Sequence, residues 1–320
     1  MKYIIGAYAT APSTVTWDKD LESQYYQQLK ASDNIQGLEH PFVGKLHPFD
    51  DDWFLANIDN NWQFIFTSIP GVMANLANDP HFGIASTDED GRQAALEFYQ
   101  QARQAILKLN QHIGRQSVSY IKIHTAPKIS TQISSSTLAL KTSLKTMQSW
   151  DWYGAKLIIE HCDAHIPEQP AEKGFLNLAD EIASVLSVNN ELNSDIGISI
   201  NWGRSAIETR SAKGPIEHIK MASQSKLLKG IIFSGASGED TPYGQWRDSH
   251  MPPAKAFNIP HFANGSLLTI EQIERSLQQC NCDELAFIGA KISLSPNKAT
   301  VLERISYIKS LLTLIEKAVN

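Results

Sequence analysis

Short apolar runs rich in β-forming residues recur along the chain, and each ends in small or polar residues before an amphipathic stretch begins. Most runs are continuously apolar rather than alternating, which is typical of strands that a parallel sheet buries on both faces. We predict eight strands: Tyr3–Ala9, Gly37–Phe42, Phe64–Pro70, Tyr120–Pro127, Lys156–Asp163, Ile196–Gly203, Gly230–Ala236 and Leu285–Ile292.

The stretches between these runs have helical periodicity. In Arg92–Ile113, for example, apolar residues recur at three- and four-residue spacing, as on one face of a helix. The predicted helices are Leu21–Ala31, Arg92–Ile113, Ser135–Gln148, Leu176–Val188, Pro215–Ser223, Ile270–Gln278 and Ala299–Val319. The link after the second strand is the least regular, and Asp50–Ala56 predicts one short helix there.

Strands that alternate with helices indicate βαβ units and a parallel sheet. Eight units with no β segment left over favour an α/β fold closed into a (β/α)8 TIM barrel, which we expect to form one domain over residues 1–320. The structural alternative is an open, doubly wound sheet. Its phosphate-binding signature, G-x-G-x-x-G after the first strand, is absent, because Gly6 stands alone.

Composition excludes several classes of partner. The formal net charge is −6 and no basic cluster is present, so we expect no nucleic-acid partner. Apolar runs such as Leu157–Ile159 are too short to span a bilayer, and the N-terminus has no signal-peptide pattern, which predicts a cytoplasmic protein without a membrane partner. Three cysteines indicate a reducing compartment, and the Cys280/Cys282 pair lacks the second pair that a zinc site needs.

Polar residues gather where the predicted strands end, and active sites of TIM barrels lie at the C-terminal ends of their strands. The residues concerned are Glu39, His40, Thr67, Ser68, Lys122, His124, Thr125, Glu160, His161, Asp163, Asn201, Trp202, Arg204, Ser234 and Lys291. Side chains alternate between the two faces of a strand, so Glu160 and His161 point in opposite directions. The sequence leaves open which of the two faces the barrel axis.

Several of these residues have both a functional and a structural interpretation. A lysine inside an apolar strand, such as Lys291, is costly unless it is paired or functional. Arg204 suits an oxyanion clamp or an ion pair with Glu160 or Glu208. His124 suits an acid/base role or a hydrogen-bonded core position.

A long loop, Ser237–Phe262, follows the seventh strand and carries glycine, proline and aromatic residues. Long loops in compact domains are often lids or binding loops. We expect this loop to cover part of the mouth and to bring Tyr243, Trp246 or His250 towards a ligand. Trp202 and Trp246 are candidates for stacking on a sugar ring, or for ordinary packing between barrel and helix.

Six stretches together resemble a known family over nearly the whole chain. They are Gly37–Glu39, Asp52–Leu55, Ile69–Gly71, Asp88–Arg92, Glu160–Ala164 (EHCDA) and Asn201–Glu208 (NWGRSAIE). The chain resembles the xylose-isomerase-like TIM barrels, and within them a bacterial family that is catalogued as a domain of unknown function. The resemblance implies the fold and brings no established reaction.

Sugar epimerases of that superfamily hold one divalent metal with a Glu, an Asp, a His and a second Glu. The resemblance places Glu160 at the first glutamate, and Asn201, Ser234 and Lys291 at or near the other three positions. An amide is a weak ligand for a hard cation and an ammonium repels it, so we expect no metal cofactor. The fallback is Mn or Zn on Glu160, His161 and Asp163, with His124 as the alternative imidazole.

We therefore expect a sugar or sugar-derivative isomerase, epimerase or lyase, with Glu160 and Lys291 forming an electrostatic unit in place of the metal. The expected catalytic residues are Glu160, Lys291, His124 and Arg204, and the expected substrate-binding residues are Glu39, Asn201, Trp202, Ser234, Trp246 and His250. Glu160 would be the acid/base, and Lys291 and Arg204 would stabilise an oxyanion. The alternatives are a metal-dependent hydrolase and a non-catalytic sugar-binding barrel, and a homo-oligomer is left open.

Overall fold

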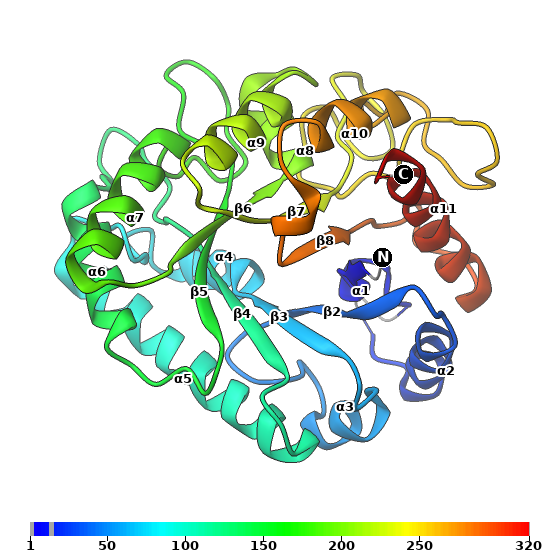
Figure 1. Ribbon diagram of the computed structural model, residues 1–320, viewed down its shortest axis with the longest axis horizontal. Coiled ribbons are helices and arrows are strands. Elements are labelled where there is room, and N and C mark those ends of the chain that lie inside the picture. The colour runs from blue at the N-terminus through cyan, green and yellow to red at the C-terminus, as the bar shows by residue number, and fades with distance from the viewer. Residues whose placement is uncertain (1–2, 13–15, 320) are drawn as a thin grey trace. The chain divides into compact units, whose positions relative to one another are not determined.

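The eight strands of the protein are parallel neighbours in one closed barrel, in the order β1 to β8 (Figure 1). This architecture comes from a computed structural model that describes residues 3–12 and 16–319. The strands are β1 Tyr3–Ile5, β2 Ile35–Pro41, β3 Gln63–Thr67, β4 Val118–Ile123, β5 Lys156–His161, β6 Gly197–Asn201, β7 Leu228–Phe233 and β8 Phe287–Ala290. The predicted closed (β/α)8 TIM barrel is confirmed, and the open sheet is excluded.

Helices occupy the links between strands, as the periodicity predicts. They are α1 Ala7–Thr10, α2 Lys19–Lys30, α3 Asp51–Asn57, α4 Ile69–Asn78, α5 Glu89–Ile113, α6 Thr137–Gln148, α7 Leu178–Leu192, α8 Trp202–Thr209, α9 Gly214–Gln224, α10 Ile270–Leu277 and α11 Val301–Val319, with a 3-10 turn at Cys282–Glu284. Capping residues fix several starts: Asp18, Asp88 and Asn177 each accept a hydrogen bond from a backbone N–H of the first turn.

Every predicted strand runs past the C-terminal end of the observed one, and in three of them the last residues begin a helix. The residues after β1, β3 and β6 form α1, α4 and α8. Pro70 lies in the first turn of α4, where its missing N–H has no partner to lose. Asn201 ends β6 and caps α8 by accepting a hydrogen bond from the backbone N–H of Arg204 at 3.4 Å. The polar residues Ser68 and Asn201 stand at the N-caps of α4 and α8 and mark these two boundaries.

The chain divides into two compact units. One consists of Met1–Glu39, Ala56–Gln63 and Ile200–Asn320, and it contains β1, β7 and β8; we call it the β7–β8 unit. The other consists of His40–Leu55 and Phe64–Ser199, and it contains β4 and β5; we call it the β4–β5 unit. The expectation of a single domain stays a prediction.

Each unit has a sheet segment packed against its own helices. In the β4–β5 unit, α5 and α7 pack on β4 and β5, and α6 lies against both helices. In the β7–β8 unit, α8 and α9 pack on β7, and α11 packs on β8. The strands are buried along almost their whole length, which explains why their sequences are continuously apolar.

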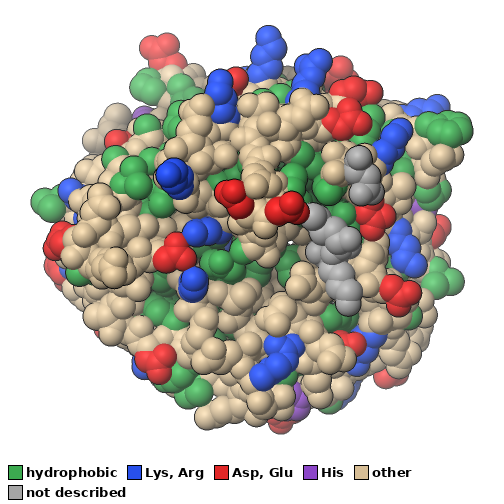
Figure 2. All heavy atoms as spheres, in the orientation of Figure 1, with side chains coloured by type: hydrophobic (Ala, Val, Ile, Leu, Met, Phe, Trp, Pro, Cys, Tyr) green, Lys and Arg blue, Asp and Glu red, His purple; other side chains and the backbone are tan. Residues whose placement is uncertain are grey.

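The described surface mixes both signs of charge. Figure 2 shows Lys and Arg side chains interspersed with Asp and Glu on the face that it presents. Among the described residues, no helix combines the length and apolar character that crossing a bilayer would need. The expected absence of a nucleic-acid partner stays a prediction.

Gly37 generates a prediction about packing. A Cβ atom at this position in β2 would lie 1.8 Å from the backbone oxygen of Gln63, which no rotamer change can relieve. Gly37→Ala should therefore lower the free energy of unfolding by about 3 kcal/mol or more, as overpacking against backbone does. Urea denaturation would measure this. Gln36→Ala, at the exposed neighbour in the same strand, is the control and should change stability by less than about 0.5 kcal/mol. Equal effects of the two substitutions would contradict the prediction.

Candidate active site

A buried carboxylate, Glu160, lies at the end of β5 between two proton-bearing groups of the same unit. The ammonium Nζ of Lys122 donates to its Oε1 at 2.6 Å, and Nε2 of His124 lies 3.1 Å from its Oε2. All three side chains are shielded from solvent. Burial of a charge is tolerated when it is paired and hydrogen-bonded, and this trio meets that condition.

The register of the strands explains why these side chains meet. Lys122 in β4 is the register partner of Ile158 in β5, and Glu160 lies two residues further along. Residues two apart share a face of a strand, so Glu160 lies on the same side of the sheet as Lys122. This answers the question of orientation that the sequence left open: Glu160, and not His161, shares the face of Lys122.

His161 points the other way and belongs to a different cluster. Its Nδ1 lies 2.7 Å from Oε2 of Glu181 on α7, and the hydroxyl of Thr125 donates to the other oxygen of Glu181 at 2.6 Å. Asp163 accepts a hydrogen bond from the backbone N–H of Lys173. Glu160 therefore leaves the strand on the face opposite to His161. The fallback metal set of Glu160, His161 and Asp163 stays a prediction.

A second buried ion pair lies in the β7–β8 unit. Lys291, which directly follows β8, donates from Nζ to Oε1 of Glu39 in β2 at 2.7 Å, and both side chains are shielded from solvent. The ammonium also lies 4.8 Å from the centre of the Tyr8 ring, in the range of a cation–π contact. The expected electrostatic unit of Glu160 with Lys291 is corrected here: each residue has another partner at hydrogen-bond distance.

The structure shows how Lys291 reaches across β1 to Glu39. β1 pairs with β2 on one side and with β8 on the other. Gly6 follows β1, and a Cβ atom there would lie 2.7 Å from Cγ of Lys291. The aliphatic part of the lysine therefore passes over a position that has no side chain.

Arg204, Asp248, His250 and Ser234 form a chain of contacts in the same unit. Nε of Arg204 donates to Oδ2 of Asp248 at 3.0 Å. Nδ1 of His250 lies 3.4 Å from Oδ1 of Asp248 and 3.0 Å from the hydroxyl of Ser234. Burial, followed by the charge of Lys291, lowers the pKa of His250 to about 3. The imidazole is therefore neutral at physiological pH.

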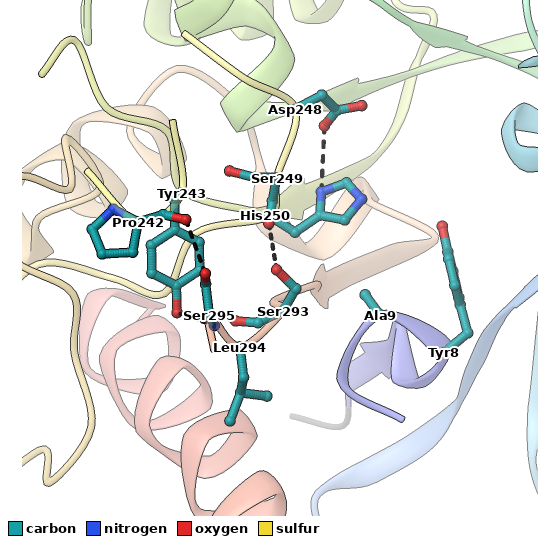
Figure 3. A pocket seen from close by; sticks show the side chains of 10 residues that line it. All are labelled: Tyr8, Ala9, Pro242, Tyr243, Asp248, Ser249, His250, Ser293, Leu294 and Ser295. Carbon is teal, nitrogen blue, oxygen red and sulfur yellow. Dashed lines mark hydrogen bonds and ion pairs between the residues drawn. The ribbon is translucent and has the colours of Figure 1, made fainter. Parts of the chain in front are cut away.

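A cavity of about 420 Å³ opens beside this chain (Figure 3). Its walls come from the segments that follow β1, β7 and β8, so it lies at the C-terminal ends of these strands. The lining residues are Tyr8, Ala9, Pro242, Tyr243, Asp248, Ser249, His250, Ser293, Leu294 and Ser295. Hydrogen bonds join the two loops that form the wall: Ser293 donates from its backbone N–H to His250, and Ser295 donates from its hydroxyl to Pro242.

The residues expected from the sequence therefore have different surroundings. Of the β7–β8 unit's candidates, Glu39 pairs with Lys291, while Arg204, His250 and Ser234 belong to the chain through Asp248. The charges of Lys291, Arg204 and Glu39 all act on His250. The loop after β7 supplies Tyr243 and His250 to the cavity, as expected of the lid segment.

The two tryptophans lie elsewhere. Trp202 donates from its indole N–H to Ser276 of α10 at 3.1 Å and is fully buried among helices. Trp246 lies under the guanidinium of Arg210 and is not among the residues that line the cavity. The packing interpretation describes both, and neither supplies a face for stacking a ligand in this cavity.

The sequence analysis assigns no role to several residues of these sites, among them Lys122, Asp248 and Ser293. Lys122 had the same signal as Lys291, a lysine inside an apolar strand, and was noted without being assigned a role. Asp248 and Ser293 lie in loops, where no periodicity reveals which way a side chain points. Their positions depend on how the loop after β7 folds back onto the loop after β8.

The residues that the resemblance places at metal positions do not fit a divalent cation. An oxygen of Glu160 is already held by the ammonium of Lys122 at 2.6 Å. Lys291 stands near the position of the second glutamate and is itself a cation. Oδ1 of Asn201 already accepts the capping hydrogen bond of α8. A metal at either lysine would meet an ammonium at close range, which is strongly unfavourable in a buried site.

The comparisons with known proteins identify the family. Residues 4–307 match the family described as a domain of unknown function, DUF4862. The chain belongs to this family. An uncharacterized protein of Salmonella typhimurium is 34% identical over 318 residues, which cover 99% of this chain and 97% of that protein.

Solved structures with the same fold include sugar-processing enzymes. A D-psicose 3-epimerase, crystallised in the presence of D-fructose, matches with a TM-score of 0.57 and 14% identity, over 99% of this chain and 98% of that one. A sugar phosphate isomerase/epimerase of Parabacteroides distasonis matches with a TM-score of 0.53 and 8% identity, over 97% and 95% of the two chains. At such low identity these matches show the fold alone, which agrees with the resemblance found from the sequence.

The Lys122–Glu160 pair generates a prediction about stability. Lys122→Met should lower the free energy of unfolding by about 3–5 kcal/mol, because it leaves a buried carboxylate without its cation. Adding Glu160→Gln should restore part of that loss, since the double variant has no buried charge at the pair. Urea denaturation of both single variants and the double variant would give the coupling energy.

The exposed pair Lys145–Glu191, also at 2.6 Å, provides the matched cycle. Lys145→Met and Glu191→Gln should couple by less than about 1 kcal/mol, as surface ion pairs do. Additive losses at Lys122 and Glu160 would show that the buried pair does not act as a unit.

Proposed function

We propose that this DUF4862 protein is an isomerase, epimerase or lyase that moves a proton on a carbon of a small sugar or sugar derivative. The single observation that carries the proposal is the position of Glu160, a buried carboxylate at the C-terminal end of a barrel strand, between an ammonium and an imidazole. In TIM barrels, chemistry takes place at this end of the strands.

Glu160 is proposed as the base. The adjacent ammonium of Lys122 favours the ionised carboxylate, which is the form that accepts a proton. The carboxylate would take the proton from a carbon beside a carbonyl, and the bonding electrons would pass to the carbonyl oxygen. His124, at 3.1 Å, is proposed as the second acid/base, which exchanges a proton with Glu160.

Lys291 and Arg204 keep the proposed role of stabilising negative oxygen. Each is a buried cation held by one carboxylate, Glu39 and Asp248 respectively. A cation whose position is fixed before the reaction stabilises developing charge without the cost of reorganisation. Glu39, Ser234 and His250 are proposed to contact the substrate, and so is Asn201, whose buried Nδ2 has no hydrogen-bond partner within the described chain.

The comparisons support the substrate class and no finer detail. The matched structures include an epimerase studied with D-fructose and a sugar phosphate isomerase/epimerase, so a small sugar is the proposed substrate. Lys291 is proposed to supply positive charge where the sugar epimerases that the sequence resembles hold a metal, and the proposed reaction needs none. A metal-dependent hydrolase and a sugar-binding barrel without activity are the outcomes that the two experiments below would reveal.

The first experiment tests the base. The purified protein, incubated in deuterated water with a panel of aldoses, ketoses and their acid and phosphate derivatives, should introduce deuterium at a carbon beside the carbonyl of at least one member. Glu160→Gln should lower that exchange rate by about 10²–10⁴-fold, because the amide cannot accept the proton. Mass spectrometry would measure the exchange.

Glu191→Gln is the matched control, because it makes the same chemical change at an exposed position on α7. It should leave the exchange rate unchanged. Binding of a sugar without any exchange would favour the non-catalytic barrel, and exchange that survives Glu160→Gln would remove Glu160 from the mechanism.

The second experiment tests the absence of a metal step. Prolonged treatment with EDTA, followed by gel filtration, should leave the exchange rate within about two-fold of the untreated protein, because ammonium groups supply the positive charge. Metal analysis by mass spectrometry would accompany the assay. Loss of activity on chelation with recovery on adding Mn or Zn would contradict the prediction and favour the metal-dependent hydrolase.

A further inference from the structure

The cavity beside β8 presents hydroxyl groups rather than cations to a ligand. Among the ten described residues that line it, five carry a hydroxyl, one is the neutral His250, and the only charged one is the carboxylate Asp248. Its volume of about 420 Å³ lies within the range of small-molecule sites, roughly 300–1,000 Å³. A lining of this kind donates and accepts hydrogen bonds without providing a counter-ion.

The two cations nearest to His250 are already compensated. Lys291 is held by Glu39 at 2.7 Å, and Arg204 is held by Asp248 at 3.0 Å. A phosphate group is usually bound by an arginine fork, a lysine or the N-terminus of a helix, each with positive charge to spare. A phosphate in this cavity would have to compete with Glu39 or Asp248 and would lie against a carboxylate.

The position of His250 is fixed on one side of its ring. Nδ1 faces Asp248 and Ser234, and Figure 3 shows the ring between Asp248 and Tyr8, with its other nitrogen turned towards the Tyr8 side. A histidine whose Nδ1–H is directed at a carboxylate presents Nε2 as a hydrogen-bond acceptor. The residue also has a left-handed backbone, with φ of 52°, which is uncommon outside glycine and concentrates at functional sites.

We propose that this cavity binds the hydroxyl-rich part of an uncharged sugar or alditol, that Nε2 of His250 accepts a hydrogen bond from a ligand hydroxyl, and that phosphate esters of the same sugars bind poorly. Asp248 acts twice: it orients His250 and it neutralises Arg204. This inference rests on the proposed function for the substrate class and adds the discrimination between neutral and phosphorylated sugars.

The test is calorimetric titration of the wild-type protein with neutral hexoses, pentoses and alditols, each paired with its phosphate ester. At least one neutral member should bind, and its phosphate ester should bind at least ten-fold more weakly. His250→Asn, chosen because asparagine tolerates a left-handed backbone, should weaken the neutral ligand at least ten-fold. His261→Asn is the control, because His261 stacks on Tyr307 outside the cavity, and it should leave the affinity unchanged.

Asp248→Asn is an independent variant that should favour binding of the phosphate ester. It releases the guanidinium of Arg204 from its carboxylate, so the preference for the neutral sugar over its phosphate ester should shrink at least ten-fold or reverse. Circular dichroism melts of each variant would show that the fold is retained. If Asp248→Asn does not fold, His250→Asn and the wild-type comparison still decide the proposal.

Three results would overturn the inference: the phosphate esters bind more tightly than the neutral sugars in the wild-type protein, no neutral member binds, or His250→Asn and His261→Asn have equal effects. These results are separate from failure of the proposed function. If only phosphorylated sugars exchange deuterium, the proposed function stands and the preference for neutral sugars is wrong. If a neutral sugar binds tightly through His250 but no sugar exchanges deuterium, the preference for neutral sugars stands and the proposed function is wrong.

Discussion

A buried ammonium must have a carboxylate beside it, and this requirement shapes both clusters of the protein. Lys122 and Lys291 each extend from the end of a barrel strand into a region without solvent, and each donates to a glutamate within 2.7 Å. Neither lysine would be tolerated there alone, because an unpaired buried charge costs several kcal/mol. Their partners, Glu160 and Glu39, come from other strands, so the pairs also constrain which strand ends lie next to each other.

The same requirement explains what the sequence could and could not reveal. The eight strands were predictable because burial on both faces makes them continuously apolar. The roles of Glu39 and Lys122 were not, because an ion pair is a property of two strands and the sequence displays each strand alone. Glu39 and Lys291 lie 252 residues apart. In the sequence, Gly6 shows only that the G-x-G-x-x-G motif is absent, whereas in the structure the side chain of Lys291 passes over it.

The sequence also left open which neighbouring side chains share a face with Glu160. The alternation along β5 showed that Glu160 and His161 face opposite ways, and only the register with β4 shows that Glu160 shares the side of Lys122. The position of Asp248 could not be predicted for a different reason. It lies in a loop whose path depends on contacts between the segments after β7 and β8, and the sequence has no periodicity that predicts such contacts.

Charge compensation also limits which anions the protein can hold. In the β7–β8 unit, Lys291 and Arg204 are each paired with a carboxylate, so a ligand with a permanent charge gains little that Glu39 and Asp248 do not already provide. A transient oxyanion is different, because an ammonium has three donors and one glutamate oxygen engages only one of them. Such a lysine is a weak site for a bound phosphate and a strong one for charge that develops on an oxygen already held in place. A fixed, paired cation therefore favours neutral substrates whose charge appears only during the reaction, which is the property required of an enzyme that forms an enediolate from an uncharged sugar.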